Sequence, residues 1–231
     1  MRARTRRPVL AESDVALQRP SELRHHFDDV VQQREASTLG MWAFLATEVL
    51  FFGGMFCAYT IYRSAYHGAF ESTSQFMNVT IGGINTGVLI CSSLTMALAV
   101  RAAQLGQKKP LIWLLILTLV LGGVFLGLKG VEYHEKYVEH HVPGPGFRYA
   151  EAQYAHQAEL LFFLYFAMTG LHALHMIVGA GLITTLIVMA ARNRFSAGWY
   201  TPVDMIGLYW HFVDIVWIFL FPLLYLIGHT K

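Results

Sequence analysis

Residues 159–191 read ELLFFLYFAMTGLHALHMIVGAGLITTLIVMAA, a stretch long and apolar enough to cross a membrane as one helix. About 20 consecutive apolar residues span the ~30 Å hydrocarbon core of a bilayer, and this stretch is longer. After Glu159, its only charged or imidazole side chains are those of His172 and His175. The length predicts a transmembrane helix that tilts or extends beyond the bilayer.

Four other apolar runs have lengths near that of a membrane span, and they cover residues 38–62, 78–100, 111–128 and 203–227. Hydrophobic residues make up 55% of the chain, and the mean hydropathy of +0.44 is far from that of a soluble domain. We therefore predict an all-α fold, a polytopic membrane helix bundle with five transmembrane helices. The run at 111–128 is short unless its helix continues through Glu132 and Tyr133.

The first 36 residues differ from the rest of the chain. They are polar, begin with four arginines before Pro8, and contain no apolar core, so they do not form a secretory signal. We predict an N-terminal segment at residues 1–36, with one short amphipathic helix at 21–34. Residues 37–231 then form the membrane domain.

The distribution of Lys and Arg predicts the orientation. With five spans, twelve of these 17 residues lie on the side of the N-terminus and five on the other. Cytoplasmic segments are enriched in Lys and Arg, so we predict a cytoplasmic N-terminus and an external loop at 143–146. Four residues of the tail then either collect protons on the cytoplasmic face or form an ordinary solvated surface. They are His25, His26, Asp28 and Asp29.

Ionisable side chains inside the predicted spans are the candidates for function, because each costs a few kcal/mol or more in hydrocarbon. They are Glu48, His172, His175, His211 and Asp214. Glu48 lies ten residues into its span, about 15 Å deep, and its neighbours one helical turn away are apolar. Its partner must come from another helix or chain. It is either a neutral, hydrogen-bonded group that fixes packing or a titrating group.

The spacing of the membrane histidines leaves two interpretations open. His211 and Asp214 are three residues apart and can pair across one helical turn, and His172 and His175 repeat that spacing. Such histidines either ligate a haem, one from each of two helices, or form hydrogen bonds between helices. We favour hydrogen bonds, because a haem-binding bundle usually has two pairs of facing histidines and the second pair is lacking.

A patch of ligand-type side chains follows the third span, and it contains Glu132, His134, Glu135, Glu139, His140 and His141. We favour solvated charge over a divalent metal site here. Lys129 lies close to the end of the third span, where a Lys side chain can extend to the membrane interface. The sequence contains no phosphate-binding glycine loop, GxSxG, HExxH or dinucleotide fingerprint. We therefore predict no catalytic residue, no metal site and no nucleic-acid partner.

Motifs in all five spans carry a family resemblance. The most specific is YWHFVDIVW at 209–217, and ATEVLFFGG at 46–54 is moderately specific. The others are GMW at 40–42, Asn85-Thr86, Leu121-Gly122 with Phe125, Glu132-Tyr133, and the segment from Tyr165 to Gly179 with TGLHALH at 169–175. Together they resemble subunit III of haem–copper cytochrome c oxidases, in its five-span bacterial form.

The resemblance implies an accessory subunit without cofactors, with haem and copper in partner subunits. It implies direct contact with the catalytic subunit I, assembly with subunit II and other respiratory subunits, bound phospholipid, and support of proton uptake. Arg192 is the candidate phospholipid contact. The implied location is the bacterial inner membrane, with the C-terminus periplasmic. The mitochondrial form has two further spans, so a lipid-holding cleft is expected to be closed or filled differently here. The mitochondrial form also carries Gln where this chain has Lys129.

The sequence leaves other functions open. The five-span form also occurs in quinol oxidases and in a relative associated with nitric oxide reductase, and the chain itself touches none of these substrates. A haem-bearing electron-transfer subunit is an alternative from another class. So is a proton-coupled transporter using Glu48 and Asp214, although such a transporter would more often show an internal repeat, which we do not find.

Overall fold

The computed structural model describes residues 24, 26–74, 77–149 and 154–226. Five long helices in this part of the chain are apolar enough to cross a membrane, which confirms the predicted all-α bundle. The helices are α2 (Val30–Ala65), α3 (His67–Ser74), α4 (Val79–Gln104), α5 (Lys108–Val138), α6 (Ala155–Ala191) and α7 (Thr201–Tyr225). The third span does continue through Glu132 and Tyr133, and the short helix α3 was not predicted.

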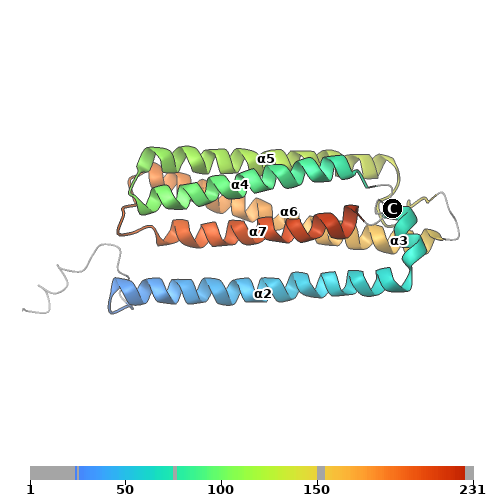
Figure 1. Ribbon diagram of the computed structural model, residues 1–231, viewed down its shortest axis with the longest axis horizontal. Coiled ribbons are helices and arrows are strands. Elements are labelled where there is room, and N and C mark those ends of the chain that lie inside the picture. The colour runs from blue at the N-terminus through green and yellow to red at the C-terminus, as the bar shows by residue number, and fades with distance from the viewer. Residues whose placement is uncertain (1–23, 25, 75–76, 150–153, 227–231) are drawn as a thin grey trace, which may run out of the picture.

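Helices α4 to α7 pack together, whereas α2 lies along one side of them next to α7 (Figure 1). Helix α3 connects the end of α2 to the bundle and contacts α6. Within the described chain, α2 buries only Leu45, Phe52 and Tyr59, which are seven residues apart and form one narrow seam. Most of the surface of α2 therefore faces outward.

The ends of the helices are set by local capping. Asp29 caps α2, where its Oδ1 accepts a hydrogen bond from the backbone N–H of Gln32 at 2.7 Å. The helix predicted at residues 21–34 is therefore wrong for the described residues before Val30, where a turn precedes Asp29, whereas residues 30–34 are helical as the start of α2. Between α4 and α5, Gly106 has a φ of 67°, a conformation that glycine adopts without strain.

Trp210 of α7 occupies the middle of the bundle core. Its ring lies against Gly122 of α5 and Gly179 of α6, where an added Cβ atom would come within 2.9 Å of the indole. Its Nε1 donates a hydrogen bond to Ser92 Oγ of α4 at 3.0 Å. The two glycines thus create the space in which one large side chain joins four helices.

Candidate functional site

Glu48 and His175 form a polar pair between α2 and α6. Glu48 Oε2 and His175 Nε2 are 3.2 Å apart, and the two side chains are only 18% and 16% exposed. Phe52 packs edge-on against the imidazole at 5.3 Å between ring centroids. The partner of Glu48 therefore comes from another helix of the same chain, as the apolar neighbourhood of Glu48 predicted.

The hydrogen bonds of His175 determine where a proton lies in this pair. His175 Nδ1 is 2.8 Å from the carbonyl oxygen of Leu171, which can only accept, so Nδ1 carries a hydrogen. A neutral imidazole protonated at Nδ1 presents Nε2 as an acceptor, which then requires a protonated Glu48. A doubly protonated imidazole instead requires an ionised Glu48. In both cases one proton lies between the side chains and the pair is neutral overall.

A cavity of about 380 Å³ adjoins this pair. Side chains of α2, α6 and α7 line it, and apart from Glu48, His175 and Tyr209 they are aliphatic, methionine or phenylalanine. Tyr209 also donates a hydrogen bond to the carbonyl oxygen of His175 at 3.0 Å. The pair is thus held rigidly at the edge of an apolar cavity.

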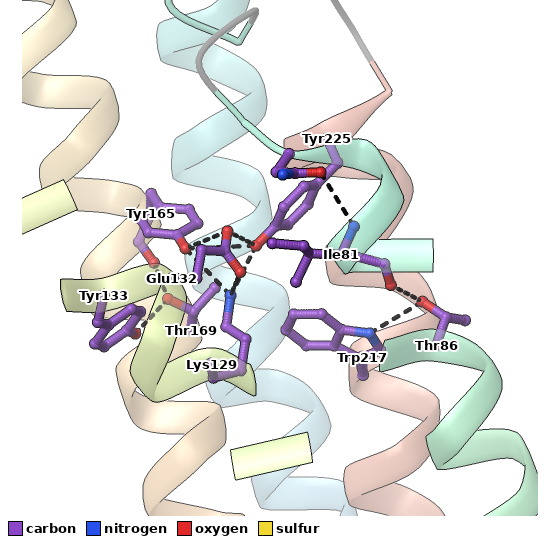
Figure 2. Close-up of polar contacts among 11 residues, drawn as sticks. Ile81, Thr86, Lys129, Glu132, Tyr133, Tyr165, Thr169, Trp217 and Tyr225 are labelled. Atoms are coloured by element: carbon purple, nitrogen blue, oxygen red, sulfur yellow. Dashed lines mark hydrogen bonds and ion pairs between the residues drawn. The ribbon is translucent and has the colours of Figure 1, made fainter. Parts of the chain in front are cut away.

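A second polar group, the outer cluster, consists of Lys129, Glu132, Tyr165 and Tyr225 (Figure 2). Lys129 Nζ donates to Glu132 Oε2 at 2.9 Å, to the Tyr165 hydroxyl at 3.1 Å and to the Tyr225 hydroxyl at 2.7 Å. Both tyrosines donate in turn to Glu132 Oε1. All three ammonium hydrogens and both carboxylate oxygens are therefore satisfied.

The outer cluster corrects two expectations. Lys129 and Glu132 are 4% and 1% exposed, so Glu132 is not solvated charge and the Lys129 ammonium group is enclosed among the helices of the bundle. The apolar run ends at Leu128, but the helix continues and neighbouring helices cover its next turn. The rings of Trp217 and Tyr133, at 5.0 and 5.6 Å from Lys129 Nζ, add cation–π contacts. The cluster joins α5, α6 and α7 as a neutral unit.

The remaining membrane histidines differ in their contacts. His211 Nδ1 is 2.7 Å from Ser93 Oγ of α4, which confirms a hydrogen bond between helices. The predicted pairing of His211 with Asp214 is wrong, because the imidazole bonds to Ser93. Ser93 also lies close to Asp214, but the carboxyl oxygens make no well-aligned hydrogen bond with the described residues. The hydrogen bond predicted for His172 is also wrong. Its ring is enclosed by Phe125 and Trp217, and neither nitrogen finds a partner in the described chain.

The structure also bears on ligand binding. Both nitrogens of His175 are engaged, so haem ligation there would break two hydrogen bonds. Within the described residues, no group of three or more His, Cys, Asp and Glu side chains could hold a metal ion.

The candidate residues at the end of the bundle where α2 begins lie apart from these groups. Arg192 lines a cavity of about 510 Å³ together with Arg24, Arg194 and Trp199. His26 and Asp28 lie in the turn before α2. His25 lies outside the described residues.

Sequence reasoning missed two contacts that attach α2 to the bundle, one at each end of the helix. Arg34 donates to the Tyr200 hydroxyl at 2.8 Å and lies 3.4 Å from Asp204 Oδ2, both on or next to the first turn of α7. Its guanidinium also lies 4.9 Å from the centroid of the Tyr200 ring. At the other end of α2, the Tyr59 hydroxyl donates to the carbonyl oxygen of Leu223 at 2.7 Å. No short-range pattern signals pairs so distant in sequence.

These features define a class of protein: a membrane helix bundle with internally neutralised charges and one helix left mostly uncovered, as in a subunit of a larger membrane complex. The family model described as "Cytochrome c oxidase subunit III" matches residues 16–229. The chain belongs to the cytochrome c oxidase subunit III family.

Individual relatives agree with this assignment. The chain is 30% identical over 204 residues to "Cytochrome c oxidase subunit 3" of Thermostichus vulcanus, covering 87% of this chain and 92% of the relative. It is 29% identical over 190 residues to "Probable cytochrome c oxidase subunit 3" of Nocardia farcinica, covering 82% and 87%. It is also 29% identical over 209 residues to "Cytochrome bo(3) ubiquinol oxidase subunit 3" of Pseudomonas aeruginosa, covering 90% and 92%.

Proposed function

We propose that this accessory subunit III stabilises the catalytic subunit I of a haem–copper terminal oxidase in aerobic respiration. The observation that carries the proposal is the uncovered surface of α2, a 36-residue helix that buries three residues within the described chain. Apolar surface of that extent suits contact with partner helices and lipid. In the proposed complex, subunit I is a direct partner, subunit II belongs to the same assembly, and haem and copper belong to the partner subunits.

Co-purification tests this function. An affinity tag on this chain should bring down a complex that contains subunits I and II, identified by mass spectrometry, with the optical spectrum of haem. The chain purified alone should show no Soret band and no stoichiometric copper or iron. One haem per isolated chain would overturn the proposal and support an electron-transfer subunit.

The electron donor of the complex is a separate question. The relatives include subunits named for a cytochrome c oxidase and for a ubiquinol oxidase, at nearly equal identity. We propose cytochrome c as the donor because the matching family model carries that name. Oxygen consumption by the purified complex with reduced cytochrome c, compared with a quinol, distinguishes the two.

For the location, we propose the bacterial inner membrane, with a cytoplasmic N-terminus and a periplasmic C-terminus. The excess of Lys and Arg at the inner end of the bundle supports this orientation. The test replaces Cys57 and Cys91 by Ser and introduces single cysteines at Ser13 and Gly146. An impermeant reagent should label the two positions from opposite sides of a sealed membrane, and labelling from one side contradicts the orientation.

We propose that Arg192 binds the headgroup of a phospholipid. Three arginines surround the cavity that it lines, and a phosphate would balance their charge. Arg192→Gln should lower the phospholipid that co-purifies with the complex, as measured by lipid mass spectrometry. Arg101→Gln is the matched control, because Arg101 also lies at the inner end but bonds to Gln104 at 3.4 Å. Equal lipid loss in both variants would contradict a specific role of Arg192.

We also propose that the tail residues His25, His26, Asp28 and Asp29 help to collect protons for uptake by subunit I. Replacing all four by Asn should slow turnover mainly at high pH, where collecting groups matter most. Asn keeps the cap of α2, because it accepts the same backbone hydrogen bond as Asp29. An unchanged pH profile would discard this role and leave an ordinary solvated surface.

A further inference from the structure

Asp214 is a buried carboxyl group, 2% exposed, that the described residues hydrogen-bond incompletely. Ser93 lies close enough to interact with it, but neither oxygen makes a well-aligned hydrogen bond with the described residues, and a single hydroxyl could serve only one of the two oxygens. The helical rise places Asp214 about 20 Å from the start of α7 at Thr201 and about 16 Å from its end at Tyr225. A carboxyl group with an unsatisfied oxygen near the middle of a membrane is unfavourable, which points to a further partner beyond the described residues.

Asp214 lines a cavity of about 280 Å³ between α4 and α7, which we call the α4–α7 groove. Ser93 and His211 line the same groove and are bonded to each other at 2.7 Å. The groove is thus polar at three side chains, two of which already satisfy each other. Asp214 keeps at least one carboxyl oxygen unused within the described chain, even where Ser93 serves the other.

Apolar side chains surround these polar groups. Ile90 and Leu94 of α4 and Ile215 and Ile218 of α7 line the groove and are 45% to 61% exposed. A polar centre within an apolar rim is a common arrangement for association of helices in a membrane, where hydrogen bonds add to van der Waals packing.

The chemistry of the groove selects its occupant. Lipid acyl chains fill apolar surfaces but carry no hydrogen-bond donor. Lipid headgroups lie outside the hydrocarbon core, which is ~30 Å thick, and their phosphates would meet a carboxyl group rather than a cation. A neighbouring transmembrane helix can place a hydroxyl, amide or ammonium group at this depth.

We propose that the α4–α7 groove receives a transmembrane helix of a partner oxidase subunit, and that this helix donates a hydrogen bond to Asp214. The inference rests on the proposed function as an accessory subunit, and it adds the face of contact and the residue at its centre. Ser93 and His211 flank the contact as a pair that is already satisfied, so they add no unpaired polar group to the interface.

Substitutions of Asp214 separate this role from a structural one. Asp214→Leu removes an incompletely hydrogen-bonded carboxyl group from the isolated full-length chain, so the thermal stability of that chain in detergent should stay equal or rise. In the complex the same change strands the partner's donor, so retention of the subunit on dilution should weaken at least about threefold. Asp214→Asn keeps an acceptor oxygen and should restore most of the retention.

Asn85 provides a matched control. It is fully buried in α4, and both atoms of its amide lack a partner among the described residues, but it does not line the groove. Asn85→Leu should therefore leave retention unchanged. If Asp214→Leu destabilises the isolated chain while retention stays normal, the carboxyl group serves the bundle itself and the proposal is overturned.

Photocrosslinking identifies the occupant. A benzoylphenylalanine at Ile215, in the groove, should crosslink in the purified complex to a transmembrane peptide of a partner subunit, and that peptide should contain a donor side chain. The same probe at Ile177 of α6, which is 57% exposed and outside the groove, should not reach that peptide. Crosslinks at Ile215 to lipid alone, or to a segment without a donor, overturn the inference.

The outcomes also separate this inference from the proposed function. If the chain does not purify with any oxidase subunit, the proposed function fails, and the inference that rests on it fails too. If the complex purifies intact but the partner helices crosslink only from other faces, the function stands and the groove proposal alone is wrong.

Discussion

His175 Nε2 of α6 lies 3.2 Å from Glu48 Oε2 of α2, and one proton joins the two groups into a neutral pair. The pair lies between the two end contacts of α2, which are made by Arg34 and Tyr59. Because α2 has only one narrow buried seam, these three polar contacts carry much of its attachment to the bundle. Loss of one of these contacts should weaken retention of the subunit in the complex more than it lowers the initial rate of oxygen consumption.

Substitutions of Glu48 test this view. Glu48→Gln keeps a donor for His175 Nε2, so assembly and the initial rate of oxygen consumption should stay nearly intact. Glu48→Ala strands that nitrogen, which costs about 1–3 kcal/mol and should weaken retention of the subunit. The measurements are subunit stoichiometry after purification and oxygen consumption over repeated turnovers.

The time to inactivation distinguishes the two roles left open for Glu48. If the pair is purely structural, only Glu48→Ala should shorten the active life of the complex. If exchange of the proton matters, both variants should shorten it. Loss of the first turnovers in Glu48→Gln would instead mean that Glu48 lies on an obligatory proton path, and the accessory role would be wrong.

The spans were predictable because membrane insertion depends on the summed hydropathy of a segment, which the sequence contains directly. The contacts of the histidines were not, because they depend on what the adjacent helix presents at the same depth. His211 faces Ser93, 118 positions away, and sequence spacing within α7 favoured Asp214 instead. Spacing along one helix shows which pairs are possible, whereas the packing between helices decides which of them form.

The outer cluster illustrates a different limit. Lys129 and Glu132 have the i,i+3 spacing of a helical ion pair, although we did not predict their contact from the sequence. Their depth was misjudged because the apolar run ends at Leu128. Burial of this turn depends on Tyr165 and Tyr225, which approach from α6 and α7 and supply the hydrogen bonds that make the buried charges tolerable.

Glycine substitutions test the packing around Trp210. Gly122→Ala and Gly179→Ala would each place a Cβ atom 2.9 Å from the indole, and overpacking of this kind costs about 1–3 kcal/mol. Gly123→Ala and Gly181→Ala are matched controls on the same helices, because a Cβ there meets nothing within 4 Å in the described structure. Thermal unfolding in detergent should show a loss for the first two variants only, and equal effects in all four would contradict this packing.

The outer cluster should show strong energetic coupling. Lys129→Met or Glu132→Gln alone leaves a buried charge without its counter-ion, and breaking a buried pair costs about 3–5 kcal/mol. The double variant removes both charges and keeps an acceptor for Tyr165 and Tyr225, so it should lose less than either single variant. This double-mutant cycle is measured by unfolding each variant and following tryptophan fluorescence, to which Trp217 beside Lys129 should contribute. Additive losses would mean that the charges act independently.

Acid should loosen the loop between α5 and α6. Burial lowers the pKa of His141 from its ordinary value of 6.5, more than its hydrogen bond with Glu139 raises it. The unfolded loop therefore binds a proton more readily than the folded loop, and stability falls as the pH drops below about 6.5. Burial alone would raise the pKa of Glu139, but Lys136 and His141 outweigh burial and lower the pKa from 4.5. The stability that the ionised Glu139 contributes is therefore lost only at still lower pH.

Amide hydrogen exchange checks this pH dependence. After correction for intrinsic rates, the Arg148 N–H, bonded to the carbonyl oxygen of His140 at 3.0 Å, should lose protection between pH 7 and pH 5.5. His141→Phe should remove that step, because it keeps the stacking on Phe162 without a titrating ring. His140→Asn is the control, since Asn tolerates the φ of 57° at that position, and it should keep the step. Equal pH dependence in wild type and His141→Phe would show that another group controls the loop.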